Sequence, residues 1–372
     1  MVLKLLMAAA AALAGEMKDS PDLEHCDGIA AAGRAICRTA ADCPAKPFLP
    51  SRTLKALAAS TAARPAHVRI LFYGQSIVEQ GWHTNIVRRL KERYPTARLE
   101  VENRAIGGFT SPDLIRTAES DLYPFYPDIL FFHVYGPLDR YEAIIRKVRE
   151  TTTAEIVLWS SHLNWSESAD RATVEKSLKG HPDARTRGIR EIAERYGCLF
   201  VDLRRRWGET MLAKGWTAKD LLADGVHMKR TSPAFALYSD TIADVLMGEA
   251  KGSVPTVSGD IEEIPLSDKR VVKGDDGALT LDFDGNRVVA VSDGAGTVPV
   301  RIGLDGRSPA SFPEMFYTTR PSKFISWMPM IKHVDIEKES RPVEEDWTLT
   351  FIPGTHALGD PIHYMVVGSK TG

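Results

Sequence analysis

The sequence contains a serine, an aspartate and a histidine whose surroundings suit nucleophilic catalysis. Ser76 follows the apolar run 68–73 and comes two residues after Gly74, which gives the chain room to turn. Much later, Asp224 precedes His227 by three residues in a turn that contains glycine. A carboxylate at this spacing can hold the imidazole in one tautomer, and a serine hydroxyl needs such a base to become a nucleophile. These three residues form a candidate catalytic triad.

A pair of glycines is the third feature of this kind. Gly107 and Gly108 follow the short strand-like run 99–102, and adjacent glycines let backbone N–H groups approach a ligand closely. Such groups can stabilise a developing oxyanion, and one donor is worth about 3–4 kcal/mol of activation barrier. Each feature also has a plainer interpretation: a serine that caps a helix, a solvated Asp–His turn and an ordinary tight turn.

The elements that would position these residues alternate between strands and helices from about residue 65 onward. Strand-like runs lie at 68–73, 99–102, 129–134, 156–159 and 199–201, and apolar residues at helical spacing lie at 85–93, 141–150, 189–196 and 235–246. This rhythm predicts a three-layer α/β domain with a parallel sheet. Ligands of such sheets bind at the carboxyl ends of the strands, where the serine, the glycine pair and the Asp–His turn would meet.

The chain changes character after residue 250. Short β-like runs at 279–283, 288–291, 298–302, 347–352 and 364–367 are separated by turns rich in Gly, Asp and Pro. We interpret this region as a β-sandwich-like accessory domain. The sequence stops at Gly372, directly after a strand-like run, so we expect that further strands of this domain are missing.

The N-terminus has the layout of a secretory signal. Lys4 precedes an apolar stretch at 5–14, which ends in an A-x-A pattern at 12–14. The stretch is too short to span a bilayer, so we expect a signal peptide at 1–15 and a secreted or periplasmic protein. The alternative is an alanine-rich helix that begins the folded protein. The expected organisation is then an N-terminal extension at 16–64, the α/β domain at 65–250 and the β-rich domain at 251–372.

The cysteines fit an exported chain. Cys26, Cys37 and Cys43 are clustered and could form disulfides, whereas Cys198 lies in an apolar run and is expected to be a buried, inert thiol. No cysteine pair has zinc-site spacing with histidines, so no metal is expected.

The order of the motifs resembles the conserved blocks of the SGNH (GDSL-like) hydrolases. Residues 74–76 (Gly-Gln-Ser) are similar to the first block, with Gln in place of the usual Asp, and residues 103–108 are similar to the second. Residues 224–227 match the last block, D-x-x-H, in full. The resemblance covers about residues 65–250 and implies a flavodoxin-like domain. It also implies that Ser76 is the nucleophile, that Asp224 and His227 supply acid and base, and that the N–H groups of Ser76 and Gly108 form the oxyanion hole.

The third block departs from the family pattern. It should read G-x-N-D, but residues 136–139 read Gly-Pro-Leu-Asp, so Leu138 stands where the oxyanion asparagine is expected. His133, at the end of a predicted strand, and Asn164, after the next strand, are candidate substitute donors. His133 could equally be a core histidine and Asn164 a plain loop amide. Loss of one oxyanion donor slows catalysis by about 10²–10³-fold without abolishing it.

The resemblance implies a serine hydrolase that needs no cofactor and cleaves ester bonds, most simply O-acetyl esters on a polysaccharide or oligosaccharide. The β-rich region looks like the accessory module of some exported family members thought to act on glycans. Trp82 and Trp165 lie near the predicted sheet edge and are candidates for stacking on sugar rings. Because the first and third blocks are altered, the alternative is a degenerate domain that binds glycans with little turnover. A glycosidase would need two carboxylates that flank the bond, and no convincing pair is present.

The composition adds limits on the partners. The net charge is −2, with 44% hydrophobic and 26% charged residues, which is ordinary for a soluble globular protein. This balance gives no electrostatic reason to expect nucleic acid or an anionic membrane as a partner. The expected partner is a glycan or a small ester, with no membrane insertion once the signal is removed.

Overall fold

The computed structural model describes residues 4–8, 51–179, 182–247, 262–283, 287–291, 301–312, 343–352 and 363–372. The chain divides into two compact units, Met1–Thr297 with Arg320–His333 and Val298–Thr319 with Val334–Gly372. The A-x-A pattern at 12–14 and the three clustered cysteines Cys26, Cys37 and Cys43 lie outside the described residues. The disulfides and the domain boundary at residue 250 therefore stay predictions.

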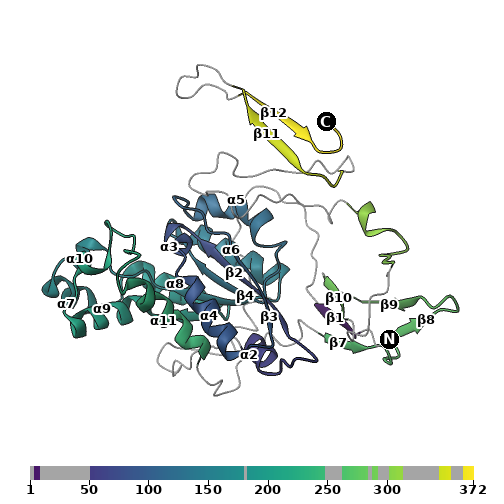
Figure 1. Cartoon of the computed structure of the whole chain (residues 1–372), viewed down its shortest axis with the longest axis horizontal. Coiled ribbons are helices and arrows are strands. Elements are labelled where there is room, and N and C mark those ends of the chain that lie inside the picture. The colour runs from purple at the N-terminus through teal and green to yellow at the C-terminus, as the bar shows by residue number, and fades with distance from the viewer. Residues whose placement is uncertain are drawn as a thin grey trace. The chain divides into compact units, whose positions relative to one another are not determined.

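A five-stranded parallel sheet forms the centre of the α/β domain (Figure 1). Its strands are β2 (His67–Gly74), β3 (Arg98–Asn103), β4 (Ile129–His133), β5 (Glu155–Trp159) and β6 (Leu199–Val201). Their order across the sheet is β3-β2-β4-β5-β6, and all neighbours pair in parallel. This is the flavodoxin-like order, with the topological switch point between β2 and β4. The predicted α/β fold class is confirmed.

Helices cover both faces of this sheet (Figure 1). They are α2 (Ser51–Ala58), α3 (Ser76–Glu79), α4 (His83–Arg93), α5 (Ser111–Asp121), α6 (Leu138–Thr151), α7 (Arg171–Leu178), α8 (Ala184–Arg195), α9 (Leu203–Lys214), α10 (Ala218–Leu221) and α11 (Ala234–Met247), with the 3-10 helix η1 at Trp165–Glu167. Helices α2, α4, α9 and α11 share one buried apolar cluster, and α5, α6 and α8 share the other. None of the described helices is long and apolar enough to cross a membrane.

The two clusters explain why the strands read as continuous apolar runs. In β2, Ile70 and Phe72 belong to one cluster, whereas Leu71 and Tyr73 belong to the other, and all four side chains are fully buried. A strand that is covered on both faces needs apolar residues at every position, not at alternate ones. Cys198 is a buried free thiol in the second cluster, as predicted.

The remaining strands form small antiparallel sheets. The strand β1 (Lys4–Ala8) pairs with β7 (Glu262–Pro265) and β10 (Arg287–Val291), β8 (Val271–Lys273) pairs with β9 (Leu279–Leu281), and β11 (Trp347–Phe351) pairs with β12 (Tyr364–Gly368), with a 3-10 helix η2 at Pro309–Ser311. The β character predicted for this part of the chain is confirmed. The sandwich arrangement stays a prediction. The signal peptide also stays a prediction, although Lys4–Ala8 lies within it and forms the strand between β10 and β7, which cleavage would remove.

Candidate active site

Ser76 lies where the topology of the sheet favours a ligand site. It is the first residue of α3, which is separated from the end of β2 by Gln75 alone, and β2 flanks the switch point. Gly74 makes this turn possible, because its φ is +155° and it pairs with His133 of the neighbouring strand. A Cβ atom at Gly74 would lie 2.2 Å from the His133 carbonyl oxygen and 2.6 Å from Val78 Cγ2. Only glycine fits here.

The structure brings the three triad candidates together. Ser76 Oγ lies 2.8 Å from His227 Nε2, and His227 Nδ1 lies 2.8 Å from Asp224 Oδ2. Because a carboxylate can only accept, Nδ1 carries the proton and Nε2 is left to accept from the serine hydroxyl. This is the hydrogen-bond sequence of a nucleophile, a general base and an orienting carboxylate.

Asp224 is held in its ionised form by the turn that contains it. Its Oδ1 accepts hydrogen bonds from the backbone N–H groups of Val226 (2.9 Å) and His227 (2.8 Å). Burial raises the pKa of Asp224, but these two bonds and the one from the His227 ring outweigh burial and lower the pKa to about 2. A charged Asp224 can stabilise the imidazolium that forms when His227 takes up a proton.

The catalytic loop, which we define as residues 221–229, is closed by its own backbone. Ala223 N–H donates to the His227 carbonyl (2.7 Å), and Lys229 N–H donates to the Leu221 carbonyl (2.8 Å). A β-bridge joins Leu222 to Met228. These bonds make the turn between Asp224 and His227 a defined structure although it is exposed.

Neighbouring elements anchor the same loop from outside. Trp165 N–H donates to the Gly225 carbonyl (2.9 Å), and the ring of His162 bonds the Val226 carbonyl through Nε2 (2.8 Å). His162 is buried, and burial lowers its pKa to about 4, so the ring is neutral and Nε2–H is the donor. Sequence reasoning assigned no role to His162, because its partner lies 64 residues away.

The glycine pair lies beside the end of β2. Ile106 N–H donates to the Gly74 carbonyl (2.9 Å), which ties the glycine turn to the strand that precedes Ser76. Gly108 has a φ of +79°, a left-handed conformation that favours glycine. Within the described ranges, the backbone N–H groups of Ser76 and Gly108 have no protein partner. They are free to bind an oxyanion.

Asn103 connects the glycine turn to the nucleophile helix. Its Nδ2 donates to the Val78 carbonyl (2.9 Å) and to His83 Nδ1 (3.0 Å), and its Oδ1 accepts from Ala105 N–H (3.1 Å). Burial lowers the pKa of His83 to about 4, so this ring is neutral and can accept. The sequence placed Asn103 at the end of a strand but gave no signal for these partners.

Of the two interpretations of His133, the structure favours the core histidine over the substitute oxyanion donor. The ring is fully buried, it is stacked on Trp159 with ring centroids 5.4 Å apart, and both nitrogens have partners. Gln75 Nε2 lies 3.3 Å from Nδ1, and Ser161 Oγ lies 3.1 Å from Nε2. Since an amide nitrogen can only donate, Nδ1 accepts and Nε2–H donates to Ser161. Burial lowers the pKa of His133 well below its usual value, which keeps the ring neutral.

This chain of bonds also accounts for the glutamine in the first block. Gln75 is 3% exposed and directly precedes Ser76. A carboxylate in its place would bring a charge into the core beside a neutral ring, which is costly, whereas the amide donates to His133 without charge.

Asn164 and Leu138 both have structural roles at the start of a helix. Asn164 caps η1, where its Oδ1 accepts from Glu167 N–H (3.2 Å) and Ser166 Oγ (2.7 Å), and its role as a substitute oxyanion donor through Nδ2 stays a prediction. Leu138 begins α6 and packs on Gly188 of α8, where an added Cβ would lie 2.3 Å from Leu138 Cδ1. The side chain that replaces the family's asparagine is therefore part of the helix packing.

The two tryptophans differ in exposure. Trp82 is 1% exposed and donates from Nε1 to the Ile77 carbonyl (2.6 Å), so its predicted contact with sugars is wrong. Trp165 is 36% exposed and is the neighbour of the catalytic loop through its backbone N–H. It stays a candidate sugar contact.

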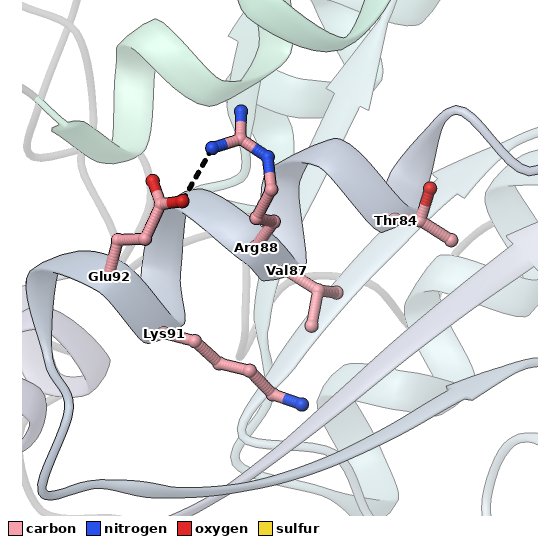
Figure 2. Close-up of a pocket in the computed structure, with 5 residues that line it drawn as sticks. All are labelled: Thr84, Val87, Arg88, Lys91 and Glu92. Atoms are coloured by element: carbon pink, nitrogen blue, oxygen red, sulfur yellow. Dashed lines mark hydrogen bonds and ion pairs between the residues drawn. The ribbon is translucent and has the colours of Figure 1, made fainter.

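A hollow of about 380 Å³ is lined by Thr84, Val87, Arg88, Lys91 and Glu92 of α4 (Figure 2). Arg88 and Glu92 form an ion pair across 2.6 Å in it. None of the triad candidates lines this hollow, so we do not assign the active site to it. The described residues contain no group of side chains that could hold a metal ion.

No protein-family model matches this chain, and no curated protein matches it. Several solved structures are similar to it. A GDSL-like lipase from Parabacteroides merdae ATCC 43184 is 20% identical, with 48% of this chain and 95% of that chain covered and a TM-score of 0.41. The acetylxylan esterase Axe2 from Geobacillus stearothermophilus is 21% identical, with 49% of this chain and 95% of that chain covered and a TM-score of 0.40.

A two-domain esterase (CEX) active on acetylated mannans is also similar. It is 18% identical, with 56% of each chain covered and a TM-score of 0.43. One of these structural neighbours, the GDSL-like lipase, is of the class that the sequence blocks resemble. The likeness concerns the fold.

Proposed function

We propose that this protein is a serine hydrolase of the SGNH type that cleaves O-acetyl esters on a polysaccharide or oligosaccharide. One observation carries the proposal: an unbroken series of hydrogen bonds of 2.8 Å each runs from Ser76 through His227 to Asp224. A serine hydroxyl is a poor nucleophile unless a base accepts its proton, and this geometry supplies the base in the required tautomer.

The chemistry follows from the placement of these groups. Ser76 Oγ attacks the acetyl carbonyl carbon while His227 Nε2 takes the hydroxyl proton. The N–H groups of Ser76 and Gly108 bind the resulting oxyanion, and the imidazolium, stabilised by Asp224, gives its proton to the departing sugar hydroxyl. Water then attacks the acetyl-enzyme with the same base, and acetate leaves as Ser76 regains its proton. The scheme uses no metal or organic cofactor.

An exposed aromatic side chain supports a glycan ester as the substrate. Trp165 is bonded through its backbone to the catalytic loop, and its exposed ring can stack on a sugar. A polymer substrate of this kind agrees with the export that the N-terminal segment predicts. Acetylated xylan and mannan are the first polymers to test, because the two esterases above are described as acting on polymers of this kind.

The experiment compares the parent with the Ser76→Ala variant on p-nitrophenyl acetate, and then measures acetate released from acetylated xylan and mannan. Removal of the nucleophile should lower kcat by at least about 10³-fold. Ser120→Ala is the matched control, since its hydroxyl donates to the Thr117 carbonyl within α5 and should leave the rate unchanged. Equal rates in the parent and Ser76→Ala would reject an esterase. Binding of the polymers with no acetate released would instead favour a glycan-binding protein.

A further inference from the structure

Gln80 links the segment that carries the nucleophile to the loop that carries the base. It is the first residue after α3, and its backbone N–H donates to the Ser76 carbonyl (3.1 Å). Its side chain reaches Met228, which directly follows His227 in the sequence. Gln80 Nε2 donates to the Met228 carbonyl (2.9 Å), and Met228 N–H donates back to Gln80 Oε1 (3.1 Å).

A pair of bonds of this kind controls more than distance. The primary amide is planar, with its donor and acceptor side by side, so two bonds to one backbone residue also restrict the orientation of that residue. The 148 residues between Gln80 and Met228 make this a tertiary contact and not a local turn. The bonds from Trp165 and His162 hold the loop at Gly225 and Val226, but they come from elements that do not carry Ser76.

We propose that Gln80 is a positioning residue that sets the separation of Ser76 Oγ and His227 Nε2, an inference that rests on the proposed hydrolase function. Without the amide, the loop would keep its internal bonds and the Asp224–His227 pair. It would lose both hydrogen bonds between Met228 and Gln80 and keep only the apolar packing of Met228 in the cluster that also contains Ile77 and Val78. A misplacement of about 1 Å in a catalytic constellation can cost about 10²-fold in rate.

Two substitutions separate this role from a general contribution to folding. Gln80→Met has similar length but neither donor nor acceptor, so both bonds to Met228 are lost. Gln80→Glu as a carboxylate keeps the acceptor for Met228 N–H but places a negative oxygen against the Met228 carbonyl. Once protonated, the new carboxyl group has the donor and acceptor of the amide again. The link should therefore be restored at low pH in Gln80→Glu alone.

The first measurement is kcat and KM for p-nitrophenyl acetate as a function of pH. We expect Gln80→Met to lower kcat by about 10–100-fold with KM unchanged, at every pH. The kcat ratio of Gln80→Glu to the parent should rise as pH falls. A ratio is used so that any pH dependence of the parent's own rate cancels. Thr84→Glu, which adds a carboxylate at an exposed position of α4, is the control for charge alone and should show a flat ratio close to one.

The second measurement follows the atoms of the contact. Hydrogen exchange of Met228 N–H should become faster in Gln80→Met, whereas the proton between His227 Nδ1 and Asp224 should keep its downfield NMR signal. Parent-like kcat in Gln80→Met, a raised KM with unchanged kcat, or a pH-independent Gln80→Glu ratio would overturn the proposal. If the parent hydrolyses no ester, the proposed function fails. Hydrogen exchange of Met228 N–H in Gln80→Met then still tests the contact between Gln80 and Met228: faster exchange supports the contact, and unchanged exchange overturns it.

Discussion

The segment that carries the nucleophile and the loop that carries the base are built in opposite ways. In residues 74–80, Gln75, Ile77 and Val78 are almost fully buried, and packing around Gly74 leaves no space for a side chain at that position. In the catalytic loop, the side chains of Asp224 and His227 are 57% and 37% exposed, and hydrogen bonds define the turn. The serine is thus placed by the core of the domain. The loop residues 223–227 are placed mainly by polar contacts, although Leu221, Leu222 and Met228 on either side of them are buried.

This difference separates two kinds of substitution. Changes in the nucleophile segment should act on the stability of the whole domain, because they disturb packing in its core. Changes at residues 223–227 of the loop should act on the reaction and leave the stability nearly unchanged, because exposed polar contacts contribute little to it. The four predictions below test this separation, from the largest expected effect to the smallest.

Asp224→Asn should give the largest loss of activity. An amide cannot hold His227 in the required tautomer, and the equivalent change in a serine protease triad lowers kcat by about 10⁴-fold. Because Asp224 is exposed, the free energy of unfolding should change by less than about 1 kcal/mol. Steady-state kinetics measure the loss of kcat, and urea unfolding of the same preparation measures the free energy of unfolding. Asp220→Asn is the control and should keep full activity, since Asp220 is an exposed residue of α10 whose carboxylate accepts from the N–H of the N-cap residue Thr217. A large loss of stability in Asp224→Asn would contradict the separation.

Substitution of glycine should show the opposite pattern in the two regions. Gly74→Ala places a Cβ 2.2 Å from a backbone oxygen, which must move, so we expect a loss of about 3 kcal/mol in the free energy of unfolding. Gly225→Ala, in the catalytic loop, meets nothing within 4 Å and should fold as well as the parent. Thermal unfolding of the two variants measures the contrast. Equal melting temperatures would show that the turn after β2 can adapt.

The same contrast explains how much the sequence alone could predict. The fold could be predicted because buried parallel strands are continuous apolar runs, as in β2 and β4. Ser76, Asp224 and His227 could be nominated because a strand end and a three-residue spacing are local features. His133 could not be assigned, since the side chains of a strand end point to either face. The roles of Gln80 and His162 depend on partners 148 and 64 residues away, which no local pattern reveals.

Acidification should weaken both regions through a buried histidine in each. His133 supports Gln75 beside the nucleophile, and His162 anchors the loop at Val226. Burial lowers the pKa of His162 from 6.5 to about 4 and that of His133 well below 6.5. Below pH 6.5 the unfolded chain therefore binds protons that the native protein does not, so stability falls as pH falls. Each ring should contribute up to about 1.4 kcal/mol per pH unit over this range.

Urea unfolding between pH 6.5 and 4 measures this slope. His162→Gln and His133→Gln should each lower the slope of the unfolding free energy against pH by up to the contribution of one proton, about 1.4 kcal/mol per pH unit. This should hold even if they lower stability at neutral pH. A slope that is the same in the parent and both variants would mean that these rings are protonated in the native state.

The smallest expected effect concerns Trp165, at the border between the loop and solvent. Trp165→Ala removes the exposed ring but keeps the backbone N–H that bonds Gly225, so the catalytic loop should keep its structure. We expect KM for an acetylated polysaccharide to rise by up to about tenfold, close to 1.4 kcal/mol of binding, while kcat/KM for p-nitrophenyl acetate stays constant. Trp165→Phe keeps an aromatic face, so its KM for the polysaccharide should lie between the values of the parent and Trp165→Ala. Equal losses on both substrates would mean that Trp165 acts through the loop and not on the sugar.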